Sequence, residues 1–224
     1  MPGGVMYRIL TGDKAYSSWS LRGWLLLAAF DLPFEDRLVR MYDPAFDAMQ
    51  AANAPARTVP QIEWDEDGVT RRVWDTLAIA ETLAERHPQA GIWPADPDHR
   101  AIARTLAAEM HSGFAALRSA CPMNIHRVPA PLKAVPDGVA ADVARLGELW
   151  SWALTETGGP WLGGPRFSAA DAFFAPVALR LHEYALSAPG AGDYAERLLE
   201  NSSVTYWIEM ANSDSRRLVR YDVA

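Results

Sequence analysis

The chain is poor in cysteine: Cys121 is the only one. This excludes an internal disulfide as well as the paired Cys-x-x-Cys motif of zinc and redox sites. A reducing, cytoplasmic environment fits this usage. An excess of basic charge is also missing, because the 224 residues carry a formal net charge of -7. A global attraction to nucleic acid or to an anionic membrane is therefore excluded, and we expect neither as a partner.

Long hydrophobic runs are missing as well. The longest, from Trp24 to Phe30, is far shorter than the roughly 20 residues of a membrane span. Residues 1–5 lack the basic and apolar regions of a signal peptide. The five histidines follow no metal-ligand spacing, so we expect no metal. A serine hydrolase is disfavoured because no Gly-x-Ser-x-Gly motif is present.

The first 87 residues alternate between strand and helix patterns. Apolar and alternating stretches predict strands over 7–10, 34–41, 59–64 and 69–74, and helical spacing predicts helices over 21–29, 44–52 and 76–87. The last two strands form a hairpin, since the turn between them contains Asp67-Gly68. The predicted order is strand, helix, strand, helix, strand, strand, helix.

The composition changes after residues 88–97, a proline-rich stretch that suits an interdomain linker. Beyond it only helical patterns occur, over 101–119, 138–157, from 169 onward, 194–199 and 204–211. Ser168 and Asp171 form a capping-box pattern that opens the third of these helices. Pro176 lies in its first two turns and is expected to bend the helix or displace its start.

Ser17 and Ser18 stand where the first predicted strand gives way to a helix. A serine at this place caps the helix by accepting a hydrogen bond from the free N–H groups of the first turn. Its hydroxyl can also donate to a bound anion, which the positive end of the helix dipole stabilises further. Both interpretations stay open from this segment alone.

Four features, in this order along the chain, resemble the cytosolic glutathione S-transferases: the motif Ser17 to Arg22, the pair Val59-Pro60, the pair Asp75-Thr76 and the capping box Ser168 to Asp171. The resemblance covers nearly the whole chain. It implies an α/β, thioredoxin-like N-terminal domain (βαβαββα) over 1–87, the linker 88–97, and an all-α C-terminal helical bundle domain over 98–224. The serine pair is most similar to the zeta class and its bacterial serine-type relatives. Trp19 and Leu21 depart from that class, which has cysteine and tryptophan at these positions.

The resemblance implies a cytoplasmic, homodimeric detoxification enzyme that takes glutathione as co-substrate and adds its thiolate to an electrophilic small molecule. Ser17 is the first candidate, and Ser18 the second, for the hydroxyl that stabilises the thiolate. Half-ionising a thiol at neutral pH requires a pKa shift of roughly 1.5 units, or about 2 kcal/mol. A hydrogen bond to a charged acceptor contributes roughly that much. Arg22 adds positive potential, or else is a surface salt-bridge residue.

For the rest of glutathione, the resemblance implies contacts from Arg57, Val59, Pro60, Asp75 and Thr76. Val59 pairs through its backbone with the cysteinyl main chain, and Pro60 follows a cis peptide bond. Thr76, at a helix N-terminus, holds the γ-glutamyl carboxylate. Asp75 binds the amino group beside it, or only caps the helix. Arg57 attracts the glycine carboxylate, or is a solvated loop charge.

Candidates for contacts with the electrophile are Met110, His111, Arg118 and Met123, because this region faces the glutathione sulfur across the domain cleft in the family. Core packing is the alternative for the methionines. Two further functions stay open. A cis-trans isomerase of the maleylacetoacetate type would add glutathione to a conjugated diacid and release it again. A glutathione-fold binding protein would show no turnover.

Overall fold

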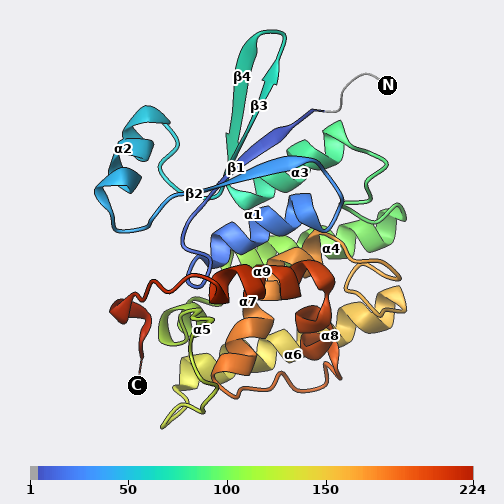
Figure 1. The fold of residues 1–224 in the computed structure, drawn as a ribbon. Coiled ribbons are helices and arrows are strands. Elements are labelled where there is room, and N and C mark those ends of the chain that lie inside the picture. The colour runs from blue at the N-terminus through green and yellow to red at the C-terminus, as the bar shows by residue number, and fades with distance from the viewer. Residues whose placement is uncertain (1–4, 224) are drawn as a thin grey trace.

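The computed structural model describes residues 5–223. Its N-terminal part contains β1 (Tyr7–Thr11), α1 (Ser18–Ala28), β2 (Phe34–Leu38), α2 (Pro44–Ala52), β3 (Gln61–Glu66), β4 (Val69–Trp74) and α3 (Thr76–Arg86). The sheet order is β2-β1-β3-β4. β1 runs parallel to β2 and antiparallel to β3, and β3 and β4 form the hairpin (Figure 1). The predicted α/β, thioredoxin-like order is confirmed.

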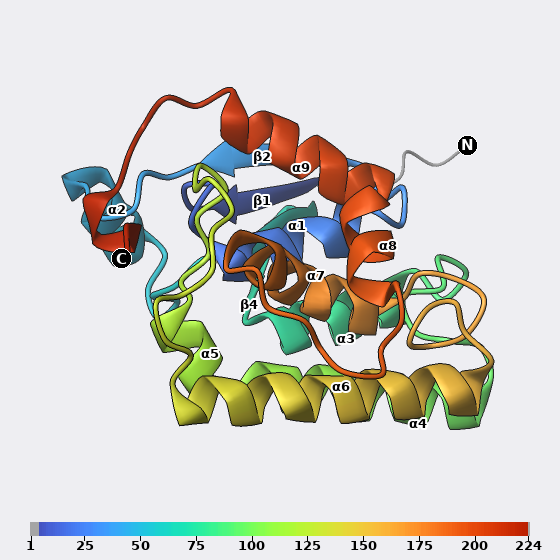
Figure 2. The ribbon, with the colours of Figure 1, turned by 90° about the horizontal axis from the view of Figure 1, so that it is seen from below.

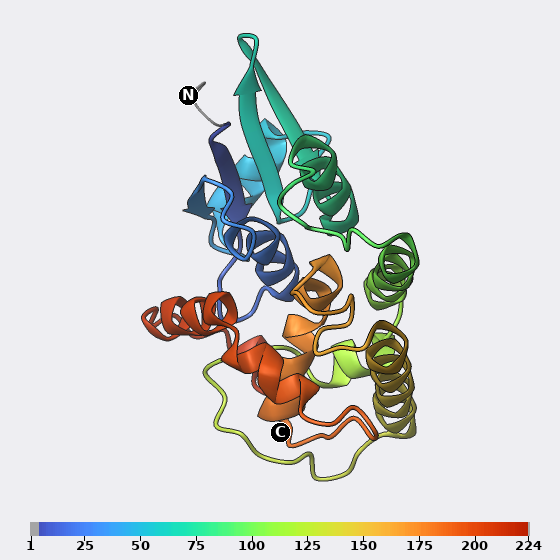
Figure 3. The same ribbon diagram turned by 90° about the vertical axis from the view of Figure 1, so that its right-hand side faces the viewer.

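The remainder of the described chain is helical. It contains α4 (Pro97–Ser112), α5 (Ala115–Ala120), α6 (Asp137–Thr157), α7 (Ala169–Glu183), α8 (Tyr194–Glu200), α9 (Ser202–Asn212) and the short 3₁₀ helix η1 (Val219–Tyr221). Figure 3 shows the sheet at one end of the molecule and these helices at the other. The predicted all-α C-terminal region is confirmed, whereas the domain boundaries at residues 87 and 98 stay a prediction. No helix within 5–223 is long and apolar enough to cross a membrane.

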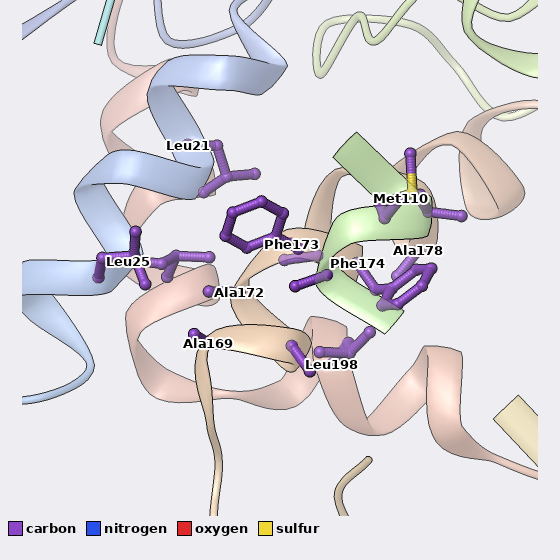
Figure 4. Packing of buried hydrophobic residues seen from close by; sticks show 14 of the residues in the cluster. Leu21, Leu25, Met110, Ala169, Ala172, Phe173, Phe174, Ala178 and Leu198 are labelled. Atoms are coloured by element: carbon purple, nitrogen blue, oxygen red, sulfur yellow. The ribbon is translucent and has the colours of Figure 1, made fainter. Parts of the chain in front are cut away.

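The main core lies where α1, α4 and α7 meet. Leu21 and Leu25 of α1 are fully buried and face Phe173 of α7, with Met110 of α4 on the far side of α7 (Figure 4). Every residue of α7 except His182 is buried. Any charged side chain on this helix is therefore held away from water, which is costly unless it finds hydrogen-bond partners.

The single helix predicted over 101–119 is wrong, because it is broken into α4 and α5. Gly113 ends α4, and Phe114 has a φ of 56°, in the left-handed region. A Cβ added at Gly113 would lie only 2.8 Å from the carbonyl oxygen of Glu109, so a side chain there would crowd the last turn of α4. The break turns α5 toward the sheet-bearing half of the molecule, where Ala115 and Arg118 reach the pocket described below.

Two smaller predictions also differ from the structure. The strand predicted over 34–41 ends at Leu38, since β2 pairs with β1 only as far as Thr11. Pro176 lies inside α7 but does not displace its start, which remains directly after the Ser168 cap. The capping box therefore sets where the helix begins.

The C-terminal segment, residues 213–223, runs back from α9 to the neighbourhood of α2 (Figure 2). Its Tyr221 packs on Tyr16, with ring centroids 4.8 Å apart, and its hydroxyl oxygen is 3.1 Å from that of Tyr42. Asn124 donates to the Tyr221 carbonyl and to Asp222. The end of the described chain thereby bridges the two halves of the molecule.

Candidate functional site

A pocket of about 1020 Å³ lies between the sheet-bearing half and the helical half. The predicted residues that line it are Ser17, Ser18, Arg57, Val59, Pro60, Asp75, Thr76, His111, Arg118 and Met123. The sequence reasoning assigned no role to Trp19, Tyr42, Arg180 and Tyr221, which also line it. Arg22 and Met110 do not. The pocket is therefore formed by residues from seven separate segments of the chain, which only the tertiary fold brings together.

The two serines differ in how their hydroxyls are used. Ser17 is the N-cap of α1: its Oγ accepts from the Ser20 N–H at 3.3 Å and donates to the Ser20 Oγ at 2.8 Å. Ser18 Oγ accepts from Arg180 Nη2 at 3.2 Å, which leaves its own proton to donate elsewhere. The Ser17 proton is thus donated within the first turn of α1, whereas no residue within 5–223 accepts the Ser18 proton.

The Val59–Pro60 peptide bond is cis, as the resemblance implies. Pro60 is buried and lies against α1 at Gly23, where an added Cβ would come within 2.5 Å of Pro60 Cγ. Glycine is needed at this close approach. The buried amide of Gln61 donates to the Thr58 carbonyl at 2.8 Å. These contacts hold Val59 at the pocket edge, next to the first turn of α1.

Asp75 and Thr76 meet His111 across the pocket. Asp75 Oδ1 caps α3 by accepting from the Leu77 N–H at 2.9 Å, and its Oδ2 lies 3.2 Å from His111 Nε2. Thr76 Oγ1 is 3.5 Å from His111 Nδ1. Burial lowers the pKa of His111; Asp75 opposes this shift, and Arg22 and Arg118 add to it. The last turn of α4 is thereby tied to the N-terminus of α3.

Two predicted site residues lie outside the pocket. Met110 is fully buried, so its prediction as an electrophile contact is corrected: it packs in the core against α7. Arg22 is also fully buried, because it points from α1 toward α7, where its Nε donates to the Phe173 carbonyl at 3.0 Å. Its guanidinium carbon lies 4.3 Å from the centre of the Trp19 ring. Arg22 is thus neither a pocket residue nor a surface salt-bridge residue.

Arg180 is the residue that sequence reasoning missed most clearly. It is 4% exposed and donates to the Cys121 carbonyl at 2.9 Å and to the Pro176 carbonyl at 3.2 Å, besides Ser18. Burial lowers its pKa to about 10, against an opposing effect of Glu183. A signal was present, since Arg180 follows Phe173 by seven residues and so lies on the same apolar stripe of the helix.

Glu183 is buried beneath this arginine, and burial raises the pKa of its carboxyl from 4.5 to about 7. Its Oε2 accepts from the Asn124 N–H at 3.0 Å, whereas Oε1 has no partner within the described residues. Because the pKa of Glu183 is higher in the folded than in the unfolded protein, the protonated carboxyl favours the folded state. This contribution to stability is fully present below pH 4.5 and is lost as the pH rises through about 7.

Glu183→Gln is therefore expected to become more stable relative to the wild type as pH rises from 4.5 to 7.5. The change in the difference is about 3 kcal/mol, at about 1.4 kcal/mol per pKa unit. Urea unfolding of both proteins across this range measures it. Glu200→Gln, at an exposed glutamate, is the control and is expected to follow the wild-type profile. A difference between Glu183→Gln and wild type that stays constant with pH contradicts the prediction.

Among residues 5–223, no group of three or more His, Cys, Asp or Glu side chains is arranged to hold a metal ion. Cys121 is buried, and burial raises the pKa of its thiol to about 11. The groups of the pocket that are able to act chemically are hydroxyls, one imidazole, guanidinium groups, the carboxylates of Asp47 and Asp75, and helix N-termini. Such a set can bind and stabilise an anion at the start of α1.

Comparisons with known proteins agree with this arrangement. A family model described as glutathione S-transferase, N-terminal domain, matches residues 16–86. A maleylacetoacetate isomerase from Anaeromyxobacter dehalogenans 2CP-1, solved with dicarboxyethyl glutathione and citrate in the active site, is 25% identical with a TM-score of 0.67. The match covers 96% of this chain and 99% of that one. A search of curated proteins found no match.

Two further structures share the fold at lower identity. A glutathione transferase homolog from Burkholderia gl BGR1, with bound glutathione, is 23% identical with a TM-score of 0.65 over 94% of this chain and 100% of that one. Glutathione transferase Omega 1C from Trametes versicolor is 18% identical with a TM-score of 0.69 over 93% and 96%. Residues 16–86 therefore match a glutathione S-transferase N-terminal domain, and the chain as a whole shares the fold of solved glutathione transferases.

Proposed function

We propose that this protein is a glutathione transferase in which the Ser18 hydroxyl stabilises the glutathione thiolate at the N-terminus of α1. The observation that carries the proposal is the hydrogen bond from Arg180 to Ser18 Oγ. Because a buried guanidinium donates to this oxygen, the hydroxyl becomes a stronger donor to a thiolate. The helix dipole of α1 adds to the stabilisation.

The other pocket residues take the rest of glutathione in this proposal. The Val59 backbone pairs with the cysteinyl main chain, and the N–H groups at the start of α3, with Thr76, bind the γ-glutamyl carboxylate. Asp75 is the partner of the amino group, and Arg57, an exposed pocket residue, attracts the glycine carboxylate. The choice of glutathione as ligand is supported by solved structures of similar fold that hold glutathione or its dicarboxyethyl derivative.

The thiolate then attacks an electrophile held against the helical side by groups that include His111, Arg118 and Met123. A sulfur–carbon bond forms and the leaving group departs, so no general base is needed once the thiol is ionised. Lowered thiol pKa and proximity supply the rate enhancement. We further propose a cytoplasmic homodimer with a detoxification role.

Ser18→Ala is expected to raise the pKa of bound glutathione by about one unit or more, because a hydrogen bond to a charged acceptor contributes roughly 1.5–3 kcal/mol. Ser17→Ala is expected to lower protein stability by about 1 kcal/mol through loss of the cap, with a smaller effect on the thiol. The ultraviolet difference spectrum of the thiolate against pH measures the first quantity, and urea unfolding the second.

Ser119→Ala is the matched control, since Ser119 lines the helical side of the same pocket. If Ser17→Ala alone moves the thiol pKa, Ser17 is the donor and the assignment to Ser18 is wrong. If glutathione binds to wild type and both variants and its thiol pKa stays at the value for free glutathione, the proposed stabilisation of the thiolate is wrong. If glutathione does not bind at all, the chain is a binding or assembly protein of the same fold.

A second candidate is glutathione-dependent cis-trans isomerisation. The similarity to the maleylacetoacetate isomerase structure favours it. Trp19 and Leu21, which replace the cysteine and tryptophan of that class, weigh against it. An assay with maleylacetone decides between addition and isomerisation. Loss of the cis isomer while free glutathione is regenerated indicates isomerisation, and consumption of glutathione indicates addition.

A further inference from the structure

Two tyrosine hydroxyls meet in the pocket from opposite ends of the chain. Tyr42 comes from the loop after β2 and is 57% exposed, whereas Tyr221 comes from η1 in the C-terminal segment. Both side chains line the pocket, and their oxygens are 3.1 Å apart although the residues are 179 positions apart in sequence. The pocket therefore contains a second group of hydroxyls besides those of the serines at the start of α1.

This tyrosine pair has one more proton than it uses. Each phenol carries one O–H proton, and the contact between the two oxygens uses one of them. Within residues 5–223, neither hydroxyl has another hydrogen-bond partner. Burial raises the pKa of Tyr221, and the contact with Tyr42 adds to this shift, so the phenol keeps its proton at neutral pH. One O–H of the pair is thus available to donate to a molecule in the pocket.

Contacts on several sides hold the pair in place. Tyr42 has a φ of 60°, in the left-handed region that bulky residues rarely adopt and that is more frequent at functional sites. The guanidinium carbon of Arg220 lies 4.1 Å from the centre of its ring. Tyr221 packs on Tyr16 with ring centroids 4.8 Å apart, and Asn124 donates to its carbonyl at 3.5 Å. Donors that are fixed before a ligand arrives lose little freedom on binding.

The pair adjoins an apolar surface. Tyr16, Met41 and Tyr221 pack together in a small hydrophobic cluster apart from the main core, and all three line the pocket. Aromatic rings and thioethers make favourable contacts with aromatic ligands. Because only Ser17 separates Tyr16 from Ser18 in the chain, this surface begins beside the start of α1, where the thiolate is proposed to lie.

We propose that the hydroxyls of Tyr42 and Tyr221 form a hydrogen-bond subsite for the second substrate, and that they favour electrophiles whose aromatic body carries a carbonyl oxygen. This inference rests on the proposed function, because it names the class of electrophile that meets the thiolate. A phenol donates to a carbonyl oxygen without requiring a charge on the ligand. The two tyrosines determine specificity: they contact the bound electrophile and take no part in forming the carbon–sulfur bond.

A matched pair of benzylic chlorides tests the subsite: 4-acetylbenzyl chloride and 4-isopropylbenzyl chloride. The acetyl and isopropyl groups have similar shapes, but only acetyl accepts a hydrogen bond. In both compounds the thiolate attacks the benzylic carbon, a carbon–sulfur bond forms, and chloride leaves. The measured quantity is the ratio of kcat/KM for the acetyl compound to that for the isopropyl compound. Each value is divided by the rate constant with free glutathione at the same pH, which removes intrinsic reactivity.

We expect wild type to prefer the acetyl compound. The double variant Tyr42→Phe, Tyr221→Phe keeps both rings and is expected to lower the normalised ratio about fivefold, through loss of one hydrogen bond. Each single variant retains one hydroxyl and is expected to lower the ratio less. Tyr206→Phe, at an exposed tyrosine of α9 outside the pocket lining, is the control and is expected to keep the wild-type ratio. If the double variant loses activity equally with both chlorides, the pair only holds the C-terminal segment in place and the subsite is wrong.

Carbon-13 NMR of an unreactive ketone separates the subsite from the proposed function. The probe is 4-methylacetophenone labelled at the carbonyl carbon, whose resonance moves downfield when the oxygen accepts a hydrogen bond. Without glutathione, we expect the bound resonance to lie further downfield in wild type than in the double variant. That result supports the subsite even if neither chloride is turned over, in which case only the transferase proposal fails.

Three results overturn the subsite. The first is a bound resonance at the same position in wild type and the double variant, and the second is absence of ketone binding to wild type. The third is turnover of both chlorides by wild type with no preference for the acetyl compound, which leaves the transferase proposal intact.

Discussion

Asp171→Ala is expected to lower the free energy of unfolding by about 4 kcal/mol or more, enough to prevent accumulation of folded protein. Asp171 is fully buried, and each carboxylate oxygen accepts two hydrogen bonds. Oδ1 accepts from the Leu162 N–H at 3.0 Å and the Tyr194 hydroxyl at 2.8 Å. Oδ2 accepts from the N–H and the hydroxyl of Ser168, both at 2.8 Å.

The loss exceeds that of an ordinary helix cap because alanine leaves the donors of Leu162, Ser168 and Tyr194 buried without acceptors. Each such donor costs roughly 1–3 kcal/mol. Asp96→Ala is the matched control: Asp96 caps α4 by accepting from the N–H groups of Asp98 and His99, but it is exposed. Its removal is expected to cost about 1 kcal/mol. Urea unfolding measures both variants, and equal losses contradict the prediction.

The capping box also shows how far sequence reasoning reaches. Ser168 and Asp171 are three residues apart, so a local rule predicts their contact. The cis Val59–Pro60 bond followed from the family resemblance, which depends on short motifs in a fixed order, and the order of strands and helices along the N-terminal part followed from hydrophobic patterns. The network that joins Asp171 to Leu162 and Tyr194 was not predictable, because it links a loop and another helix at distances that only the tertiary fold sets.

The pocket residues also fall into those that the sequence identified and those that it did not. Ser18, Val59 and Thr76 line the pocket and were identified from sequence because they lie in the short motifs that carry the family resemblance. Arg180 and Tyr221 were not, since each reaches the pocket from a distant part of the chain. A residue pattern indicates which side of a helix is buried. It does not indicate which loop or terminus lies across the opening.

Asp13→Ala is expected to release the C-terminal segment and to lower the free energy of unfolding by about 3 kcal/mol, as removal of one partner of a buried ion pair does. The Asp13 side chain is 3% exposed. Its two oxygens lie 2.8 and 2.7 Å from Arg216 Nη1, and Oδ1 lies 2.9 Å from Arg40 Nη1. The Met41 N–H donates to Oδ2 at 2.8 Å. The Asp13 carboxylate thus joins three parts of the chain: the loop after β1, the loop after β2, and the C-terminal segment.

Limited trypsin digestion followed by mass spectrometry distinguishes release of the segment from general unfolding. Arg216, Arg217 and Arg220 offer cleavage sites in the C-terminal segment, and in wild type Arg216 is held by Asp13 and donates to the Met41 carbonyl at 2.9 Å. In Asp13→Ala we expect cleavage at these arginines before any within 5–212. Asp193→Ala, which removes an exposed ion pair with Arg197, is the control and is expected to cost less than about 1 kcal/mol without new cleavage.

Release of the segment also has a consequence for the pocket. Tyr221 lines it and contacts Tyr16 and Tyr42, and we expect these contacts to loosen in Asp13→Ala because Arg216 loses its partner. Within residues 5–223, no hydrogen bond joins the side chain of Ser18 or Arg118 to the segment, so we expect Asp13→Ala to weaken binding of electrophiles more than it shifts the pKa of bound glutathione. If Asp13→Ala is cleaved in the segment but its KM for an electrophile is unchanged, this expectation is wrong, because Tyr221 then does not contribute to the substrate site.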